Sequence, residues 1–191
     1  MLKNDLKNPY DPHRSQSCLE EFLILCIFVA GKRAKQQSEK LEIFLDKLNN
    51  PEFPISALSL LNYHQIYNLL LEAKTGQYSR LAKCLYNLSG AKLDLTTCTC
   101  EQLEAIPGIG MKTSRFFITY SRENTNHAVL DTHILSWLRE FYPDAPKSTP
   151  ANVKQYKKWE LIFLNKCSEH GLSPHELDLN IWKQRQKSYI I

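Results

Sequence analysis

Lys112 and Asp131 are the residues of this sequence whose types and surroundings best suit chemistry. Lys112 comes two residues after a turn at residues 106–110 that contains two glycines, and Asp131 follows nineteen residues after Lys112. A lysine amine and an aspartate carboxylate can both take part in catalysis, provided that the neighbouring structure holds them in place. The elements around these two residues therefore decide what the pair can do.

The turn predicts a helical hairpin, in which a glycine turn joins a short helix to a second helix. The first N–H groups of the second helix have no partner within it and carry partial positive charge, so they suit a phosphate. A nucleic-acid backbone held in this way would be bound without any reading of its bases. Arg115 would lie on the same helical turn as Lys112. The alternative is an ordinary helical corner with a solvated lysine, followed by an aspartate that only caps a helix.

The composition is that of a globular protein with a sizeable core, because 43 % of the 191 residues are hydrophobic and 23 % are charged. The net charge of +4 is compatible with a polyanionic partner without requiring one. The polar start argues against a signal peptide, and the longest apolar run, residues 22–30, is too short to span a bilayer. We expect a cytoplasmic protein, or a nuclear or organellar one in a eukaryote, with no membrane partner.

The six cysteines, at positions 18, 26, 84, 98, 100 and 167, do not predict a metal site or a disulfide framework. The sequence contains no C-x-x-C pair, and the one close pair is Cys98 and Cys100. Cys26 lies in an apolar run and Cys167 on an apolar helix face, so both are expected to be small core residues. We interpret all six as thiols without a chemical role.

Apolar residues recur with helical spacing along most of the chain, and no segment alternates as a strand would, so we predict an all-α fold. Residues 18–30 are apolar nearly all round, which indicates a central helix. Further helices are expected at residues 36–48, 55–73, 79–90, 100–106, 111–122, 132–142, after Pro150, and at 175–187.

Capping signals mark the starts of three of these helices. Thr99 with Gln102 fits a capping box for the short helix before the turn. Asp131 is an N-cap candidate for the helix that follows it. Ser173 with Glu176 begins the last helix.

Two linked motifs, LEAIPGIGMK at residues 103–112 and VLDTH at 129–133, resemble the signature of the helix-hairpin-helix DNA glycosylase superfamily. That superfamily includes endonuclease III and the 8-oxoguanine glycosylases. Every element of the pattern is present in order and at matching separation, with Leu130 before the aspartate as a mild change. The resemblance covers about residues 18–185 and implies a two-lobed helical fold of the HhH-GPD type.

The resemblance implies a base-excision-repair enzyme acting on double-stranded DNA. Lys112 would attack C1′ of the damaged nucleotide, expel the base and form a Schiff base, after which β-elimination nicks the strand. Asp131 would stabilise the positive charge that develops at C1′ or help to deprotonate the lysine. Gly108, Ile109 and Gly110 match the hairpin turn of this family, which contacts phosphates near the lesion and often holds a monovalent cation on its backbone carbonyls. The target base must leave the stack to be reached.

Two departures from the family pattern and one further match indicate which branch of the family the chain resembles. The C-terminal part holds only Cys167, so no iron–sulfur cluster or other metal is expected. The loop VAGKRA after the central helix lacks the glutamine common in the family. The string ELDLNIW resembles the C-terminal helix of the archaeal-type 8-oxoguanine glycosylases, in which an aspartate and a tryptophan, here Asp178 and Trp182, help to form the base pocket. The alternative is that Trp182 is core and Asp178 a surface carboxylate.

We therefore expect a single glycosylase domain, residues 1–191, with the hairpin at 99–122 and the catalytic pair facing each other across a cleft. One lobe would span about residues 15–125, and the other would combine residues 1–14 with 126–191. The leading interpretation is a monomeric 8-oxoguanine DNA glycosylase with AP lyase activity. The rivals are the same chemistry on an oxidised pyrimidine and a non-catalytic DNA-binding module; the presence of both Lys112 and Asp131 argues against the latter.

Overall fold

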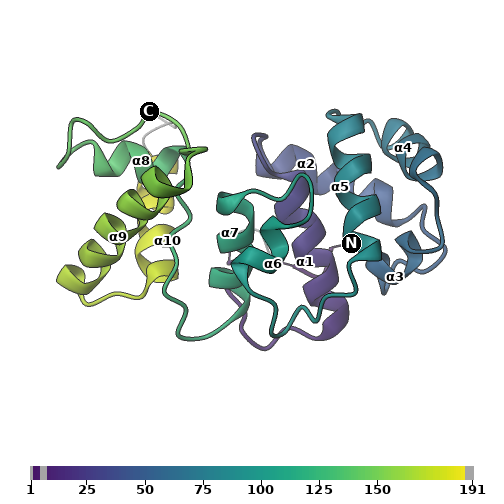
Figure 1. Ribbon diagram of the computed structural model, residues 1–191, viewed down its shortest axis with the longest axis horizontal. Helices are drawn as coiled ribbons and strands as arrows, with labels where there is room; N and C mark the ends of the chain where they lie inside the picture. Colours follow the sequence, from purple (N-terminus) through teal and green to yellow (C-terminus); the bar gives the residue numbers. More distant parts are fainter. Residues whose placement is uncertain (1, 5–7, 188–191) are drawn as a thin grey trace.

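The computed structural model describes residues 2–4 and 8–187, and the regular structure of these residues is entirely helical, as the sequence predicts. Figure 1 shows the helices in chain order. They are α1 (Gln16–Phe28), α2 (Ala34–Leu45), α3 (Pro54–Leu58), α4 (Tyr63–Glu72), α5 (Tyr78–Gly90), α6 (Cys100–Glu104), α7 (Met111–Ser121), α8 (Thr132–Leu138), α9 (Val153–His170) and α10 (Pro174–Lys187). The predicted segment 55–73 divides into α3 and α4, because Asn62 begins a new helix with a capping box.

Helix α1 is the centre of the first lobe, which consists of α1 to α7 (Figure 1). Eleven of its thirteen residues are buried, and it packs against α2, α3, α5 and α7. A helix that is apolar on all sides is stable only when other elements surround it, so the sequence of residues 18–30 dictates this central place. The α6–α7 hairpin closes one side of the lobe against α1 and α5.

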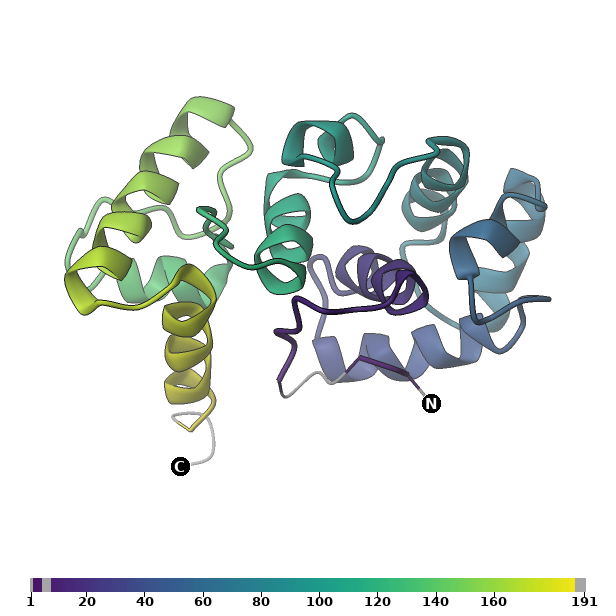
Figure 2. The same ribbon diagram turned by 90° about the horizontal axis from the view of Figure 1, so that it is seen from below.

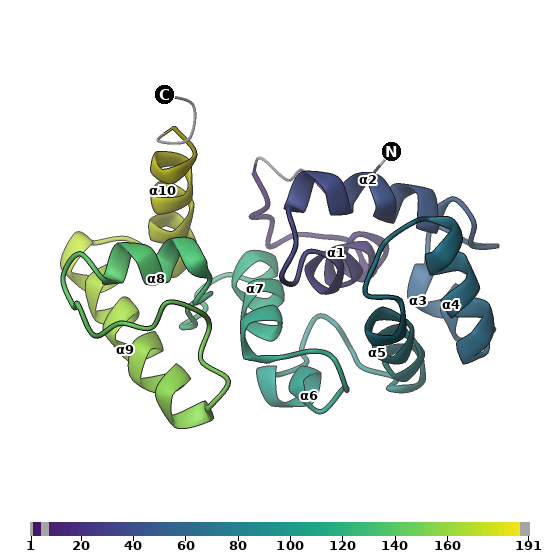
Figure 3. The ribbon, with the colours of Figure 1, turned by 90° about the horizontal axis from the view of Figure 1, so that it is seen from above.

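The second lobe consists of α8, α9 and α10 around a separate, smaller core. The face of α9 that carries Tyr156, Trp159 and Phe163 is buried in this core, as its helical spacing predicts. Figure 3 shows α7 lying beside this lobe. Helix α10 packs on α8 and α9 and also contacts α7, so α7 and α10 meet where the two lobes join.

The N-terminal segment contacts both lobes. The backbone N–H groups of Lys3 and Asn4 donate to Glu21 of α1 at 2.7 and 3.0 Å. The ring of Tyr10 stacks on that of His175 in α10, with the centroids 3.6 Å apart. Figure 2 shows the segment running alongside α1. The division that assigns residues 1–14 to the second lobe stays a proposal, since residues 3 and 4 bond to the first.

The predictions about membranes and metals can be compared with residues 2–4 and 8–187, which the structure describes. None of its helices combines the length and the apolar character needed to cross a membrane. All six cysteines are free thiols, and all but Cys18 are buried, including Cys26 and Cys167 as predicted. The same residues contain no group of three or more histidine, cysteine, aspartate or glutamate side chains arranged to hold a metal ion.

Candidate active site

The hairpin turn is fixed by one of its two glycines. Gly108 has φ +101°, and a Cβ at this position would lie 2.8 Å from the Cβ of Cys84 in α5. Both the backbone angle and the close approach to α5 therefore require glycine. Gly110 has an ordinary φ of −102° and open space around it, and it serves as the N-cap of α7. The turn is thus held against α5 while the start of α7 stays unobstructed.

Lys112 is the second residue of α7 and is half-buried. The N–H groups of Thr113 and Ser114 donate to the Gly110 carbonyl at 2.9 and 3.0 Å. Among the described contacts, the preceding N–H groups of Gly110, Met111 and Lys112 have no acceptor, as is usual at a helix start. Three backbone donors and a lysine amine therefore gather at the positive end of α7, an arrangement that suits a phosphate.

The turn itself offers less to a ligand than the sequence predicts. Ile109 is 4 % exposed and its N–H donates to the Ile106 carbonyl at 3.0 Å, so this residue offers no free donor here and the phosphate contact through Ile109 stays a prediction. A monovalent cation on the turn carbonyls fits poorly as well. The Ile106 oxygen already accepts a hydrogen bond, and a guanidinium nitrogen of Arg80 lies 3.5 Å from the Gly108 oxygen. This guanidinium would repel a cation, so we assign no step of the reaction to one.

Arg115 is not available to DNA, and the prediction that it contacts the backbone is wrong. Its side chain is 4 % exposed. The guanidinium forms ion pairs with Glu104 of α6 and, at 2.8 Å, with Glu160 of α9. It also lies 4.7 Å from the ring centroid of Tyr156. A buried guanidinium with two carboxylate partners joins structural elements rather than a ligand.

Glu160 extends this ion pair to the segment that connects the lobes. Its carboxylate accepts a hydrogen bond from the N–H of Ala128 at 3.1 Å and lies 3.7 Å from a ring nitrogen of His127. Side-chain hydrogen bonds to Cys100 and to Glu160 raise the pKa of His127 to about 9. The network therefore fixes the segment between α7 and α8, and with it the place of Asp131 relative to the hairpin.

Asp131 is the N-cap of α8, as predicted. One carboxylate oxygen, Oδ1, accepts the N–H groups of His133 and Ile134 at 2.8 and 2.9 Å. No hydrogen bond of the described residues engages the other oxygen, Oδ2. The cap holds the half-buried carboxylate in one orientation and leaves an oxygen for a second task, so capping and catalysis are compatible roles.

The carboxyl of Asp178 in α10 interacts electrostatically with two other predicted site residues, Lys112 and Asp131. Asp178 is 8 % exposed, so the alternative of a surface carboxylate is wrong. Burial, followed by the charge of Asp131, raises the pKa of Asp178 to about 8, while a hydrogen bond from the Tyr120 hydroxyl and the charge of Lys112 act in the opposite direction. These interactions place the carboxyl of Asp178 within electrostatic reach of both Lys112 and Asp131. Tyr120 belongs to the core of the first lobe, and no sequence pattern indicates that its hydroxyl interacts with Asp178.

Trp182 lies one helical turn beyond Asp178 on α10 and is half-buried. It belongs to neither of the two hydrophobic cores, nor to the partly buried side chains packed on them, among the residues described. The alternative that Trp182 is a core residue therefore lacks support. An indole that is only half covered, beside a buried carboxyl, could stack on a planar ligand.

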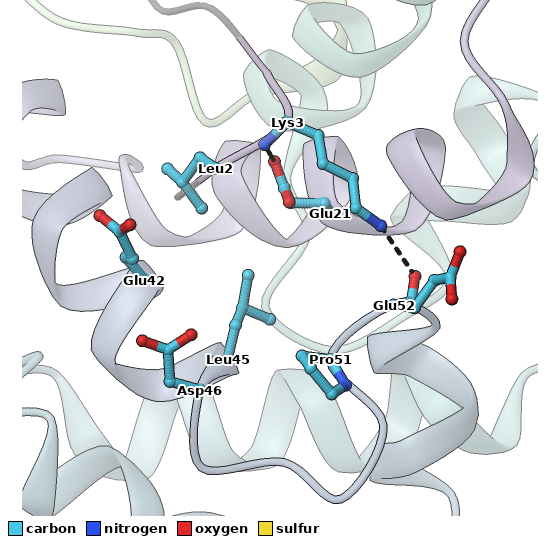
Figure 4. Close-up of a pocket in the computed structure, with 8 residues that line it drawn as sticks. All are labelled: Leu2, Lys3, Glu21, Glu42, Leu45, Asp46, Pro51 and Glu52. Atoms are coloured by element: carbon cyan, nitrogen blue, oxygen red, sulfur yellow. Dashed lines mark hydrogen bonds between the residues drawn. The ribbon is translucent and has the colours of Figure 1, made fainter.

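A cavity of about 300 Å³ lies elsewhere in the molecule, between the N-terminal segment, α1 and the end of α2. Figure 4 shows the carboxylates of Glu21, Glu42, Asp46 and Glu52 around it, with Lys3 bridging two of these residues. Such a concentration of negative charge would repel a phosphate backbone. Since α7, α8 and α10 contribute nothing to its lining, this cavity is not part of the candidate site.

Comparisons with known proteins agree with the resemblance seen in the motifs. No protein-family model matches the chain. It is 34 % identical over 88 residues to the 8-oxoguanine DNA glycosylase/AP lyase of Thermoplasma acidophilum, a match that covers 46 % of this chain and 41 % of that protein. The chain thus spans less than half the length of this curated relative.

The fold is similar to that of the 8-oxoguanine DNA glycosylase of Methanocaldococcus jannaschii. The crystal structure of that enzyme superposes with a TM-score of 0.67 at 20 % identity and covers 90 % of this chain and 79 % of the other. Its complex with a 15mer DNA containing 8-oxoguanine gives 0.68 at 19 % identity, over 92 % and 84 % of the two chains. The predicted all-α, two-lobed fold and the resemblance to archaeal-type 8-oxoguanine glycosylases are therefore confirmed.

Proposed function

We propose that this chain is a DNA glycosylase with AP lyase activity that removes 8-oxoguanine from double-stranded DNA during base excision repair. The observation that carries the proposal is the convergence of three groups where the lobes join. Lys112 stands at the unobstructed start of α7, Asp131 caps the start of α8, and the buried carboxyl of Asp178 interacts electrostatically with each of them. The names of the archaeal relatives point to the same reaction for those proteins.

In the proposed reaction the neutral amine of Lys112 attacks C1′ of the damaged nucleotide. The bond from C1′ to the base breaks, and the base leaves with the bonding electron pair. Opening of the sugar then gives an imine between C1′ and the lysine nitrogen, which only an amine nucleophile can form. Loss of a proton from C2′ breaks the bond from C3′ to its oxygen and nicks the strand on the 3′ side. Hydrolysis of the imine regenerates the lysine.

Asp131 supports the first of these steps. Positive charge develops at C1′ as the base departs, and a fixed carboxylate stabilises that charge without having to reorient. The same carboxylate can accept a proton from the ammonium form of Lys112. The cap on α8 occupies Oδ1 alone, so Oδ2 is the oxygen we assign to the reaction.

The remaining groups hold the DNA and the base. The backbone N–H groups at the start of α7, from Gly110 to Lys112, would bind a phosphate next to the damaged nucleotide. Gly108 would act indirectly, by holding the turn against α5. Asp178 and Trp182 would receive the base after it leaves the stack, the former through hydrogen bonds and the latter through stacking.

Borohydride trapping tests the proposal, because reduction converts the imine into a stable covalent link. Duplexes containing one 8-oxoguanine, one oxidised pyrimidine, one abasic site or no lesion would be compared. We expect a protein–DNA adduct on the 8-oxoguanine and abasic duplexes and its loss in Lys112→Gln. The matched control is Lys158→Gln, which alters a lysine on α9 whose side chain is 58 % exposed.

Several results would contradict the proposal. An adduct that persists in Lys112→Gln would exclude this lysine as the nucleophile. Trapping on the oxidised pyrimidine or on the abasic duplex alone would keep the lyase chemistry but reject 8-oxoguanine as the substrate. Binding to every duplex without trapping on any would identify a DNA-binding module without catalytic activity.

A further inference from the structure

The segment between α7 and α8 runs without helical structure, and side chains of the second lobe hold its backbone. The N–H of Ala128 donates to the Glu160 carboxylate at 3.1 Å, and the Ala128 carbonyl accepts a hydrogen bond from the Tyr156 hydroxyl at 2.8 Å. The N–H of Leu130 donates to the same hydroxyl at 3.2 Å. The Leu130 carbonyl accepts from the Thr149 hydroxyl at 2.7 Å. All four backbone polar groups of Ala128 and Leu130 therefore have a side-chain partner.

The Tyr156 hydroxyl acts where water cannot replace it. Ala128, Leu130 and Tyr156 are all 0 % exposed. Burial raises the pKa of Tyr156, so the hydroxyl keeps the proton that it donates to one backbone group while it accepts from another. Removal of this hydroxyl would leave two buried backbone groups without a partner, and the segment would have to move to satisfy them.

Tyr156 contacts both elements that carry the groups assigned to the reaction. Its ring centroid lies 4.7 Å from the guanidinium of Arg115, which follows Lys112 by three residues on α7. Its hydroxyl binds Leu130, the residue directly before Asp131. One side chain thus joins the helix of the lysine to the segment that ends at the aspartate.

We propose that Tyr156 is a positioning residue for the reaction, whose hydroxyl, together with that of Thr149, sets the place of Asp131 relative to Lys112. This inference rests on the function proposed above. The cap bonds of Asp131 orient its carboxylate on α8, but they do not fix where α8 begins relative to α7. The bonds of Leu130 do so, because its carbonyl belongs to the planar peptide that continues into the backbone of Asp131.

A positioning role predicts that the effect of Tyr156 passes entirely through Asp131. A misplacement of about 1 Å can lower a rate by up to about 10²-fold, so loss of the hydroxyl should slow the release of the base. Once the carboxylate of Asp131 has been removed, its position no longer matters. Loss of the hydroxyl should then change little, whereas a general loss of structure would lower the rate with or without the carboxylate.

The test is a double-mutant cycle of Tyr156→Phe with Asp131→Asn. Tyr156→Phe keeps the ring and its contact with Arg115 and removes the hydroxyl. Single-turnover release of 8-oxoguanine would be measured over a range of enzyme concentrations, which separates the maximal rate from the half-saturating concentration. We expect Tyr156→Phe to lower the maximal rate on the order of tenfold and to change the half-saturating concentration by less than about twofold. In the Asp131→Asn background the same substitution should lower the rate by less than about twofold.

Phe163→Leu is the matched control for lost packing. Phe163 is 0 % exposed on the same face of α9 and in the same core as Tyr156, and its side chain makes no hydrogen bond to the segment. Its maximal rate should stay within about twofold of native. Thr149→Val removes the other hydroxyl with little change of shape and should lower the rate by about threefold, again only while the carboxylate is present.

Hydrogen exchange of the Leu130 amide gives a readout that does not need activity. It should become faster in Tyr156→Phe relative to the amides of α9, whether or not the chain is an enzyme. Unchanged exchange would overturn the inference, and so would equal slowing of base release in the two backgrounds or no slowing in either. If Tyr156→Phe failed to fold, the cycle of Thr149→Val with Asp131→Asn would decide, and equal slowing there would overturn the inference. A native protein that releases no 8-oxoguanine would instead contradict the proposed function.

Discussion

Helix α7 supplies one cation to each of two groups of charges, and the two groups are built in opposite ways. On one side Arg115 is buried between Glu104 and Glu160, and Glu160 also accepts a backbone N–H. On the other side Lys112 is half-buried, and the buried carboxyl of Asp178 interacts electrostatically with Lys112 and with Asp131. Arg115 has oppositely charged partners within 4 Å, whereas no ion pair of the described residues engages Lys112, Asp131 or Asp178.

This difference separates a structural role from a chemical one. Opposite charges that pair with one another hold α6, α7 and α9 in a fixed arrangement. Removal of one charge would leave its buried partner without a counter-charge. Charges without such a partner retain atoms that can bind a ligand, and the raised pKa of the buried Asp178 carboxyl is characteristic of functional sites. We therefore expect substitutions in the Arg115 group to lower stability and substitutions in the Lys112 group to lower activity.

Asp131→Asn should change activity more than any other substitution that leaves Lys112 in place. Asparagine caps a helix as well as aspartate does, so the free energy of unfolding should change by less than about 0.5 kcal/mol. Loss of the negative charge beside C1′ should slow the release of 8-oxoguanine by on the order of 10³-fold, or about 4 kcal/mol in the barrier. Single-turnover base release and urea unfolding would measure the two quantities on the same preparation.

Asp131→Ala serves as the comparison for the cap. It removes both the charge and the cap of α8, so it should add a stability loss of about 1 kcal/mol to the same loss of activity. If base release by Asp131→Asn stayed within a few-fold of native while Asp131→Ala lost about 1 kcal/mol of stability, Asp131 would be only a cap. The contrast between the two charge groups would then be lost.

The fold, and the positions of Lys112 and Asp131 at the starts of their helices, could be predicted because they depend on local signals. Helical periodicity identified α1 as central, and short-range capping patterns placed Thr99 and Asp131 at the starts of their helices. Gly108 was recognisable because a tight turn of this kind needs a residue that tolerates positive φ. Each of these features is decided by residues within a few positions of one another.

The features that the sequence did not predict depend on contacts between distant parts of the chain. Arg115 looks like a surface cation in the sequence, and its burial follows from Glu160, which is 45 residues away. Tyr120 is a core aromatic, but its interaction with Asp178 of α10 joins residues 58 positions apart, which no local pattern shows. Periodicity shows that a face is buried, but it does not show which charge lies across from it.

Glu160→Gln should have the next largest effect, this time on stability. The substitution keeps the size of the side chain and an acceptor oxygen but leaves Arg115 with Glu104 as its one remaining carboxylate among the described contacts. We expect a loss of about 3 kcal/mol in the free energy of unfolding, near the lower end for a broken buried pair. Urea unfolding would measure this loss, and trapping on an abasic duplex at low temperature should stay within a few-fold of native.

Glu72→Gln provides the control for a carboxylate in an ion pair. Its partner Lys47 lies 2.7 Å away, but both side chains are at least one-third exposed, so the loss should be under about 1 kcal/mol. Equal losses for Glu160→Gln and Glu72→Gln would show that the buried network does not hold the lobes together. Abolished trapping in a folded Glu160→Gln protein would show that the two charge groups are not separate.

The smallest predicted effect is a pH dependence of stability that comes from His127. The pKa of this histidine is about 9 in the folded protein, because Cys100 and Glu160 hydrogen bond to it, against about 6.5 in an unfolded chain. The folded state therefore binds the proton more tightly, and the stabilisation is complete below about pH 6.5 and is lost as the pH rises through about 9. Because the ring is 35 % exposed, solvent screening should limit the contribution to about 1 kcal/mol.

Urea unfolding of the native protein and of His127→Gln from about pH 6 to about 9.5 would measure this contribution of His127. The difference in the free energy of unfolding between the two proteins should shrink as the pH rises. His13→Gln, at a surface position beside Glu123, is the control. A difference that stayed constant over this range would mean that His127 contributes packing alone, and the paired network would then consist of Arg115 and its two carboxylates without the histidine.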